Sequence, residues 1–127
     1  MNIEILHRPG SSAARVTMES NETLTSEGGA MLSMSGDMGI ATTTMKKGKG
    51  GIMKAMKRML SGESFFLNHF TAGLNGGEVL LATTLPGDMM TYELDSESLI
   101  VQGGSFVACE EDVDIDMSWQ GFKSFLA

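Results

Sequence analysis

The sequence predicts an all-β protein, and three observations support this prediction. Short runs of alternating and β-branched residues follow one another along the chain, turns containing glycine or proline separate them, and only one segment has helical periodicity. Short strands at such close spacing indicate a double-stranded β-helix or a β-sandwich roll of antiparallel strands, with one short helix inserted near the middle. The 127 residues suit a single domain, 1–127, with the helical insertion at about 46–62.

The first part of the chain is predicted to form five short strands. An opening hairpin pairs residues 2–6 with 14–18 across a turn at 8–12 that contains Pro9 and Gly10. Three further strands are expected, at 23–26, 30–35 and 39–44. In the second of these, alternation directs Leu32 and Met34 inward.

The strand signals become stronger after residue 64. We expect 65–72 and 78–84 to pair as a hairpin across the glycine-containing loop 73–77. The pattern continues in three short runs and then in 112–119, the clearest alternation in the chain, where aspartates separate the apolar residues. The three short runs are 89–94, 99–102 and 105–109.

The predicted helix is amphipathic. Its apolar residues recur at helical spacing, cationic side chains occupy the other face, and Gly62 ends it. About ten residues of helix are marginally stable alone, so the apolar face must rest on the sheet, on a neighbouring subunit or on a membrane surface. Its methionines favour a core or subunit interface over a membrane. The apolar face comprises Ile52, Met53, Met56, Met59 and Leu60.

Charge is segregated along the chain. The net charge is −7, yet six of the nine basic residues lie between positions 46 and 58, where no acidic residue occurs. This balance disfavours nucleic-acid binding, although the basic patch could contact an anionic membrane or partner. The patch consists of Lys46, Lys47, Lys49, Lys54, Lys57 and Arg58.

An acidic run near the C-terminal end has two interpretations. It could hold a hard cation such as calcium, but alternation explains its aspartates more simply as the solvated face of an amphipathic strand. An EF-hand is excluded because Lys123 stands where the closing glutamate would be. The run comprises Glu110, Glu111, Asp112, Asp114 and Asp116.

Other candidate sites have weak support. The loop 48–51 lacks the Ser or Thr that follows the lysine of a nucleotide-binding P-loop. His7 and His69 do not form a metal-binding motif, and His69 is expected to be a hydrogen-bonded strand residue. Glu110 and Glu111 would raise the pKa of the Cys109 thiol rather than activate it. We therefore predict no catalytic residue, metal or cofactor.

No run of residues is long and apolar enough to span a bilayer, and the first residues lack the pattern of a signal peptide. A cytoplasmic location is expected, with peripheral membrane contact through the basic helix as an alternative. The single cysteine, Cys109, is expected to be reduced.

Several motifs in order resemble one family over nearly the whole chain. They are Glu-Gly-Gly-Ala-Met at 27–31, the glycine-rich lead into the basic helix, Ser-Gly-Glu-Ser-Phe-Phe at 61–66, Pro-Gly-Asp at 86–88 and Gln-Gly-Gly-Ser-Phe at 102–106. This pattern resembles the family named for altered inheritance of mitochondria. The resemblance implies a fold similar to the tryptophan RNA-binding attenuator protein, with related units packed into closed rings. Family members usually carry two such units, and this chain is similar to the first.

These observations lead to a functional hypothesis. We expect a non-enzymatic, homo-oligomeric scaffold or interaction protein, trimeric or ring-like, with the helix as its main contact surface. The alternative is a small-ligand-binding module with a pocket at the subunit interface, and an uncharacterised enzyme ranks third.

Overall fold

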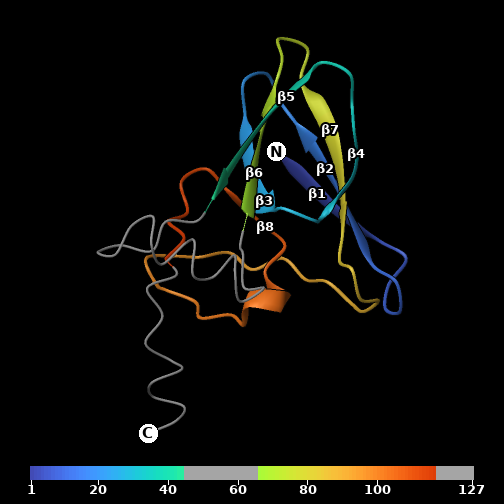
Figure 1. Cartoon of the computed structure of the whole chain (residues 1–127), viewed down its shortest axis with the longest axis vertical. Helices are drawn as coiled ribbons and strands as arrows, with labels where there is room; N and C mark the ends of the chain where they lie inside the picture. The colour runs from blue at the N-terminus through green and yellow to red at the C-terminus, as the bar shows by residue number, and fades with distance from the viewer. Residues whose placement is uncertain (45–65, 117–127) are drawn as a thin grey trace, which may run out of the picture.

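The computed structural model describes residues 1–44 and 66–116, which form two four-stranded antiparallel sheets (Figure 1). The prediction of an all-β protein is therefore confirmed. The first sheet has the order β1 (Asn2–Leu6), β2 (Ala13–Met18), β7 (Gly77–Ala82), β4 (Met31–Met34). The second has the order β5 (Met38–Thr44), β6 (Phe66–Ala72), β3 (Thr23–Glu27), β8 (Ala108–Glu110). Within the described ranges the one helical element is a 3-10 turn, η1 (Gly103–Ser105).

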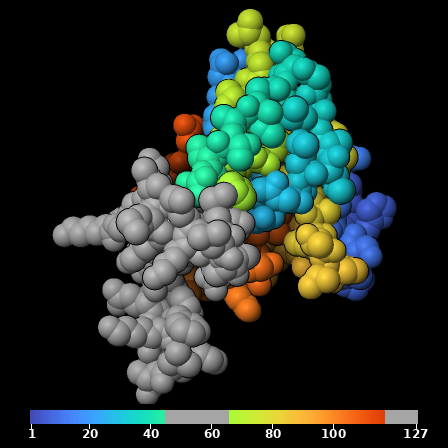
Figure 2. Space-filling model, in the orientation of Figure 1, coloured from blue at the N-terminus to red at the C-terminus, as the bar shows by residue number. Residues whose placement is uncertain are grey.

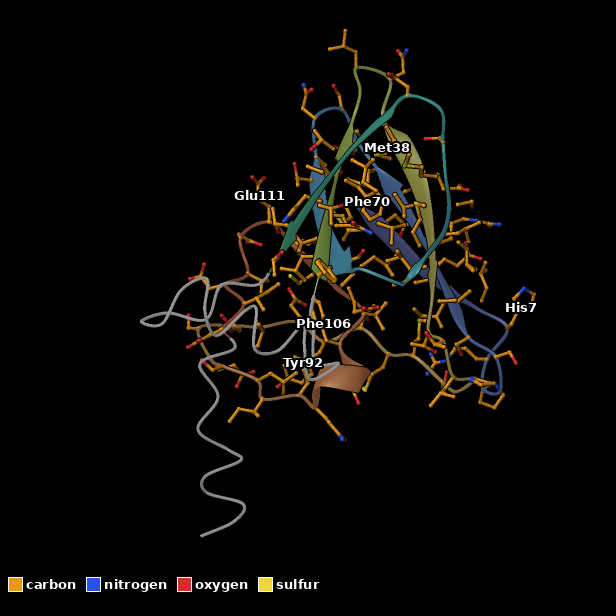
Figure 3. All side chains as sticks on the ribbon, viewed as in Figure 1. His7, Met38, Phe70, Tyr92, Phe106 and Glu111 are labelled. Carbon is orange, nitrogen blue, oxygen red and sulfur yellow. The ribbon has the colours of Figure 1, made fainter. Side chains whose placement is uncertain are left out.

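The hydrophobic core lies between the two sheets. Phe70 of the second sheet and Val79 of the first are both 0% exposed, and Figure 3 shows Phe70 between the sheets with Met38 nearer one end. Alternation explains this arrangement, because every second residue of a strand points to the same face. In β2, for example, Val16 pairs with Val79 of β7, and both side chains face the core. The cluster of buried residues comprises Ala14, Val16, Met18, Leu24, Ala30, Met38, Phe70, Ala72, Val79 and Leu81.

The predicted pairing of the strand at 65–72 with that at 78–84 is wrong. Both strands form, but β6 pairs with β3 and β5, whereas β7 pairs with β2 and β4. The connection between them holds only the isolated bridge Gly73–Gly76 and carries the chain from one sheet to the other. The opening hairpin of β1 and β2 is confirmed, with Ile3 opposite Val16.

The strand β4 differs from its predicted alternation. The register against β7 shifts between Met31 and Ser33, so the pairing contains a β-bulge. Met31 and Met34 are opposite the buried residues Leu81 and Val79, while Leu32 is 63% exposed instead of pointing inward.

The strands predicted at 89–94 and 99–102 are absent, since residues 83–102 form neither helix nor strand. The strand predicted at 105–109 is shorter than expected, since η1 occupies its start and β8 begins at Ala108. Residues 112–116 also lie outside any strand. Their predicted alternation nevertheless holds in burial, since Val113 and Ile115 are half-buried between exposed aspartates.

The helical insertion predicted at about 46–62 lies outside the described residues, and so does the end of the strand predicted at 112–119. Two stacked sheets correspond to the β-sandwich roll, and the finer prediction of a double-stranded β-helix stays a prediction. Across the part of the chain that the structure describes, no helix has the length and apolar character needed to cross a bilayer.

Candidate functional site

The most prominent surface feature is a long extended segment with exposed apolar side chains. After β7 the chain runs beneath the two sheets without entering either of them (Figure 1). We call residues 89–101 the lower segment. Its run 89–94 is joined to 97–101 by a bend at 95–96, where the Tyr92 hydroxyl donates to Oε1 of Glu97 at 2.9 Å. The exposed large apolar residues of this segment are Met90, Tyr92, Leu94, Leu99, Ile100 and Val101.

One lateral side of the sandwich is also apolar. The strands β4 and β5 are edge strands of different sheets and follow each other in the chain, so they form one side of the sandwich, which faces the viewer in Figure 2. We call this the β4–β5 side. Between positions 30 and 44 the single charged residue is Asp37. Its exposed large apolar residues are Met31, Leu32, Met34 and Ile40, with exposed fractions of 36, 63, 37 and 44%.

The start of the lower segment is fastened to the β1–β2 loop. The Asp88 carboxylate accepts hydrogen bonds from the Arg8 guanidinium and, at 2.8 Å, from the Ser12 hydroxyl. The Arg8 guanidinium, followed by the Ser12 hydroxyl, lowers the pKa of Asp88 from 3.8 to about 2. The Ser12 backbone N–H also donates to the carbonyl of Gly87. These contacts fix where the lower segment leaves the sandwich.

The opposite side of the sandwich is charged. A shallow hollow of about 360 Å³ is lined by Met1, Glu22, Thr23, Glu110, Glu111 and Asp112. The ammonium group of Met1 lies 3.1 Å from Oε1 of Glu22, and this hydrogen-bonded ion pair raises the pKa of the ammonium. The Glu19 backbone N–H also donates to Glu22 and lowers the pKa of that carboxyl. Among the described residues no group of three or more His, Cys, Asp or Glu side chains could hold a metal ion. Glu111, which belongs to the acidic run, lies at the periphery of the molecule (Figure 3).

The histidines and the cysteine have structural surroundings. His69 lies in β6, where its Nδ1 is 3.0 Å from the Thr25 hydroxyl and its Nε2 is 2.7 Å from the Thr43 hydroxyl. The prediction of a hydrogen-bonded strand histidine is confirmed. His7 is exposed in the β1–β2 loop (Figure 3).

The thiol of Cys109 is half-buried in β8. Burial, followed by the charges of Asp112 and Glu110, raises its pKa to about 11. The predicted rise in the pKa of this thiol is confirmed. Burial contributes more to the rise than the neighbouring acids, and the contributing acids are Asp112 and Glu110 instead of the predicted Glu110 and Glu111.

The predicted contact residues of the helix, both the basic patch and the apolar face, lie outside the described residues. The described residues instead expose apolar side chains on two separate surfaces, the lower segment and the β4–β5 side. Sequence reasoning missed the lower segment because it assigned 89–94 and 99–102 to strands. The available signal was the alternation of Met90, Tyr92 and Leu94 in a run for which no pairing partner had been identified.

The described fold and surface define an all-β sandwich with an unpaired apolar segment and an uncharged edge. The chain belongs to the mitochondrial biogenesis AIM24 family, whose model matches residues 3–127. This confirms the resemblance found in the sequence motifs. No curated protein and no solved structure gives a significant match.

Proposed function

We propose that this protein is a non-enzymatic, homo-oligomeric scaffold or interaction protein. The observation that supports the proposal is the apolar surface of the lower segment, in which Met90 is 74% exposed and Ile100 is 85% exposed. Monomeric proteins rarely expose contiguous apolar patches beyond roughly 300–600 Å², and larger ones are typical of interaction sites. The lower segment carries six large apolar side chains with exposed fractions between 36 and 85%, so it is a candidate interaction site.

The chemistry of the described side chains favours a binding role over catalysis. A thiol with a pKa of about 11 is almost fully protonated at neutral pH, so Cys109 is a poor nucleophile. Both ring nitrogens of His69 are already engaged by threonine hydroxyls. The ligand-binding alternative would need a pocket between subunits, and no feature of the described surface favours it over a scaffold.

The finer form of the proposal is a trimer or a closed ring of β-units, with the basic residues 46–58 available to an anionic membrane. The support for membrane contact is the segregation of six basic residues in a chain of net charge −7. Co-sedimentation with anionic liposomes tests this part, with neutral liposomes as the control. Replacing Lys54, Lys57 and Arg58 with alanine should abolish such binding, and unchanged binding would contradict membrane contact through this patch.

The oligomeric state is tested by light scattering or sedimentation velocity on the full chain. We expect a mass that is a multiple of 13.6 kDa and that persists on dilution to low micromolar concentration. A mass of one chain at all concentrations would contradict the proposal.

A further inference from the structure

We infer that residues 89–94 of the lower segment form a β-strand on the β4–β5 side of a second copy of this chain. The inference rests on the proposed oligomer and deepens it, because it names the two surfaces that meet and the mode of pairing. Its occupant is another copy of the chain, and the contact joins two different surfaces of the protein.

Among the described residues the backbone of the lower segment has no strand partner. Hydrogen bonds to the sandwich reach Gly87, but from Met90 to Val101 the described structure contains no backbone–backbone hydrogen bond. The segment is nonetheless strand-like, because Met90, Tyr92 and Leu94 alternate with Thr91 and Glu93 and so would share one face of a strand. An extended peptide with free backbone groups and alternating apolar side chains is the usual ligand of an exposed sheet edge.

Charge selects the edge that this run can join. The β1–β8 side carries Glu4 and Glu110 and adjoins the acidic hollow, so it would repel the acidic residues Glu93, Asp95 and Glu97. Symmetric pairing of two lower segments would likewise bring these carboxylates against one another. The β4–β5 side has Asp37 as its single charged residue between positions 30 and 44. It is the sheet edge on which the acidic run meets the least repulsion.

Apolar side chains on the β4–β5 side complement those of the run. Met31 and Met34 are opposite core residues of β7, and Ile40 is opposite Phe70, so all three lie at the open margin between the sheets. They are partly exposed there, and Leu32 projects from the bulge. Docked Met90, Tyr92 and Leu94 would cover this margin.

The pairing cannot be satisfied within the observed chain arrangement. Figure 1 shows the segment passing beneath the sheets instead of alongside β4, and the contacts among Arg8, Ser12 and Asp88 fasten its start there. A contact between two different surfaces of identical copies is either reciprocal, in a two-fold dimer, or repeats from copy to copy, in a ring or a filament. A lipid surface fits less well, because anionic head groups would repel Glu93, Asp95 and Glu97.

Aspartate substitutions in the run provide the first test. Met90→Asp and Tyr92→Asp place a charge in the inferred interface, and each should reduce the wild-type mass to that of one chain in sedimentation velocity. The matched control is Leu74→Asp, since Leu74 is 82% exposed in the β6–β7 loop, outside both surfaces. This control should leave the mass unchanged. Circular dichroism verifies that each variant is folded.

Cross-linking between differently marked copies provides the second test and does not depend on destabilising variants. In a Cys109→Ser background, copies with Tyr92→Cys are mixed with copies carrying Leu32→Cys and treated with a short bismaleimide. We expect covalent two-chain products from this mixture. A mixture of Tyr92→Cys with Glu4→Cys on the charged β1 edge should give none.

The outcomes separate the inference from the proposed function. A wild-type monomer contradicts both. An oligomer whose mass is unchanged by Met90→Asp and Tyr92→Asp, or that cross-links through Glu4→Cys instead of Leu32→Cys, overturns the inference and leaves the proposed oligomer standing. Binding of neutral or anionic liposomes that is lost in Met90→Asp, with no change of mass, would assign the surface to a membrane and likewise overturn it.

Discussion

The carboxylate of Asp88 accepts hydrogen bonds from both Nε and Nη2 of Arg8, at 2.9 and 3.2 Å, across 80 positions of the sequence. This two-point ion pair joins the β1–β2 loop to the residue just before the lower segment. Two parallel hydrogen bonds between a planar guanidinium and a planar carboxylate restrict the relative orientation of the two groups as well as their separation. The contact therefore determines the direction in which the lower segment leaves the sandwich.

Replacing Asp88 with asparagine should make the protein less stable at neutral pH and should remove part of its acid sensitivity. The folded pKa of Asp88, about 2, lies below the ordinary value of 3.8. The unfolded chain thus binds a proton more readily, so the stabilisation is present above the ordinary pKa and is lost as the pH falls from about 4 to 2. Melting temperatures measured from pH 7 to pH 2 should differ between wild type and Asp88→Asn at neutral pH and converge as the pH approaches 2.

The exposure of this ion pair keeps the expected effect modest and sensitive to salt. Asp95→Asn serves as the control, because Asp95 is an exposed aspartate of the same segment. Melting curves of Asp88→Asn that stay parallel to wild type over the whole pH range would show that the ion pair does not contribute.

Truncation of Phe70 should be the most damaging single change in the core. Its ring is 0% exposed between the sheets, and Phe70→Ala removes buried contacts and leaves a cavity, which costs about 3–5 kcal/mol. Urea unfolding followed by circular dichroism, at one fixed protein concentration, measures the loss. Leu74→Ala, at an 82% exposed position, should change the free energy of unfolding by less than about 0.5 kcal/mol. Equal effects of the two variants would contradict the described core.

Gly76 occupies a position that only glycine fits. Its φ is +77°, and a Cβ there would lie 2.5 Å from the carbonyl oxygen of Met18. Gly76→Ala should therefore destabilise the protein by about 1–3 kcal/mol in the same urea assay. Gly36→Ala is the matched control, because nothing lies within 4 Å of its added methyl group. A neutral Gly76→Ala would show that the β6–β7 connection has another conformation.

The raised pKa of Cys109 predicts slow alkylation of the folded protein. With a pKa of about 11, the thiolate fraction at pH 8 is roughly two hundredfold below that of an ordinary thiol with a pKa near 8.5. Reaction with iodoacetamide, followed by mass spectrometry, should be slower by at least this factor in native protein than in guanidinium chloride. The native rate should still rise between pH 8 and pH 10. Equal rates in the folded and unfolded states would contradict the described environment of the thiol.

Local patterns in the sequence predicted the strands but not their partners. The opening hairpin was predicted correctly because the turn around Pro9 and Gly10 is short and its two strands are adjacent. The pairing of β6 with β7 was predicted wrongly although the loop between them is even shorter. After β6 the chain can either turn back into the same sheet or cross to the other one. Crossing places Phe70 and Val79 on facing sheets, where both side chains are buried. That choice involves strands distant in the sequence.

Chemistry at single positions was predictable where neighbours in the sequence are also neighbours in space. The elevated pKa of the Cys109 thiol followed in direction from its acidic surroundings. The hydrogen-bonded role of His69 followed only from its place in a strand, because its partners Thr25 and Thr43 lie 44 and 26 positions away. The bulge at Leu32 was not predictable, since it arises from the register of β4 against β7, a strand more than 40 positions later. The ion pair of Arg8 with Asp88 was missed for the same reason.

The sequence by itself determined the all-β class, most strand positions, the family and the segregation of charge, because alternation, turn residues and motifs are local properties of the chain. The tertiary structure decided which strands share a sheet and which edges are apolar or charged. It also decided that residues 89–94 have a strand-like pattern without a strand partner among the described residues. The physical reason is that a strand is completed by hydrogen bonds to another strand. Its own residues specify its alternation, but only the arrangement of the whole chain specifies whether a partner is present.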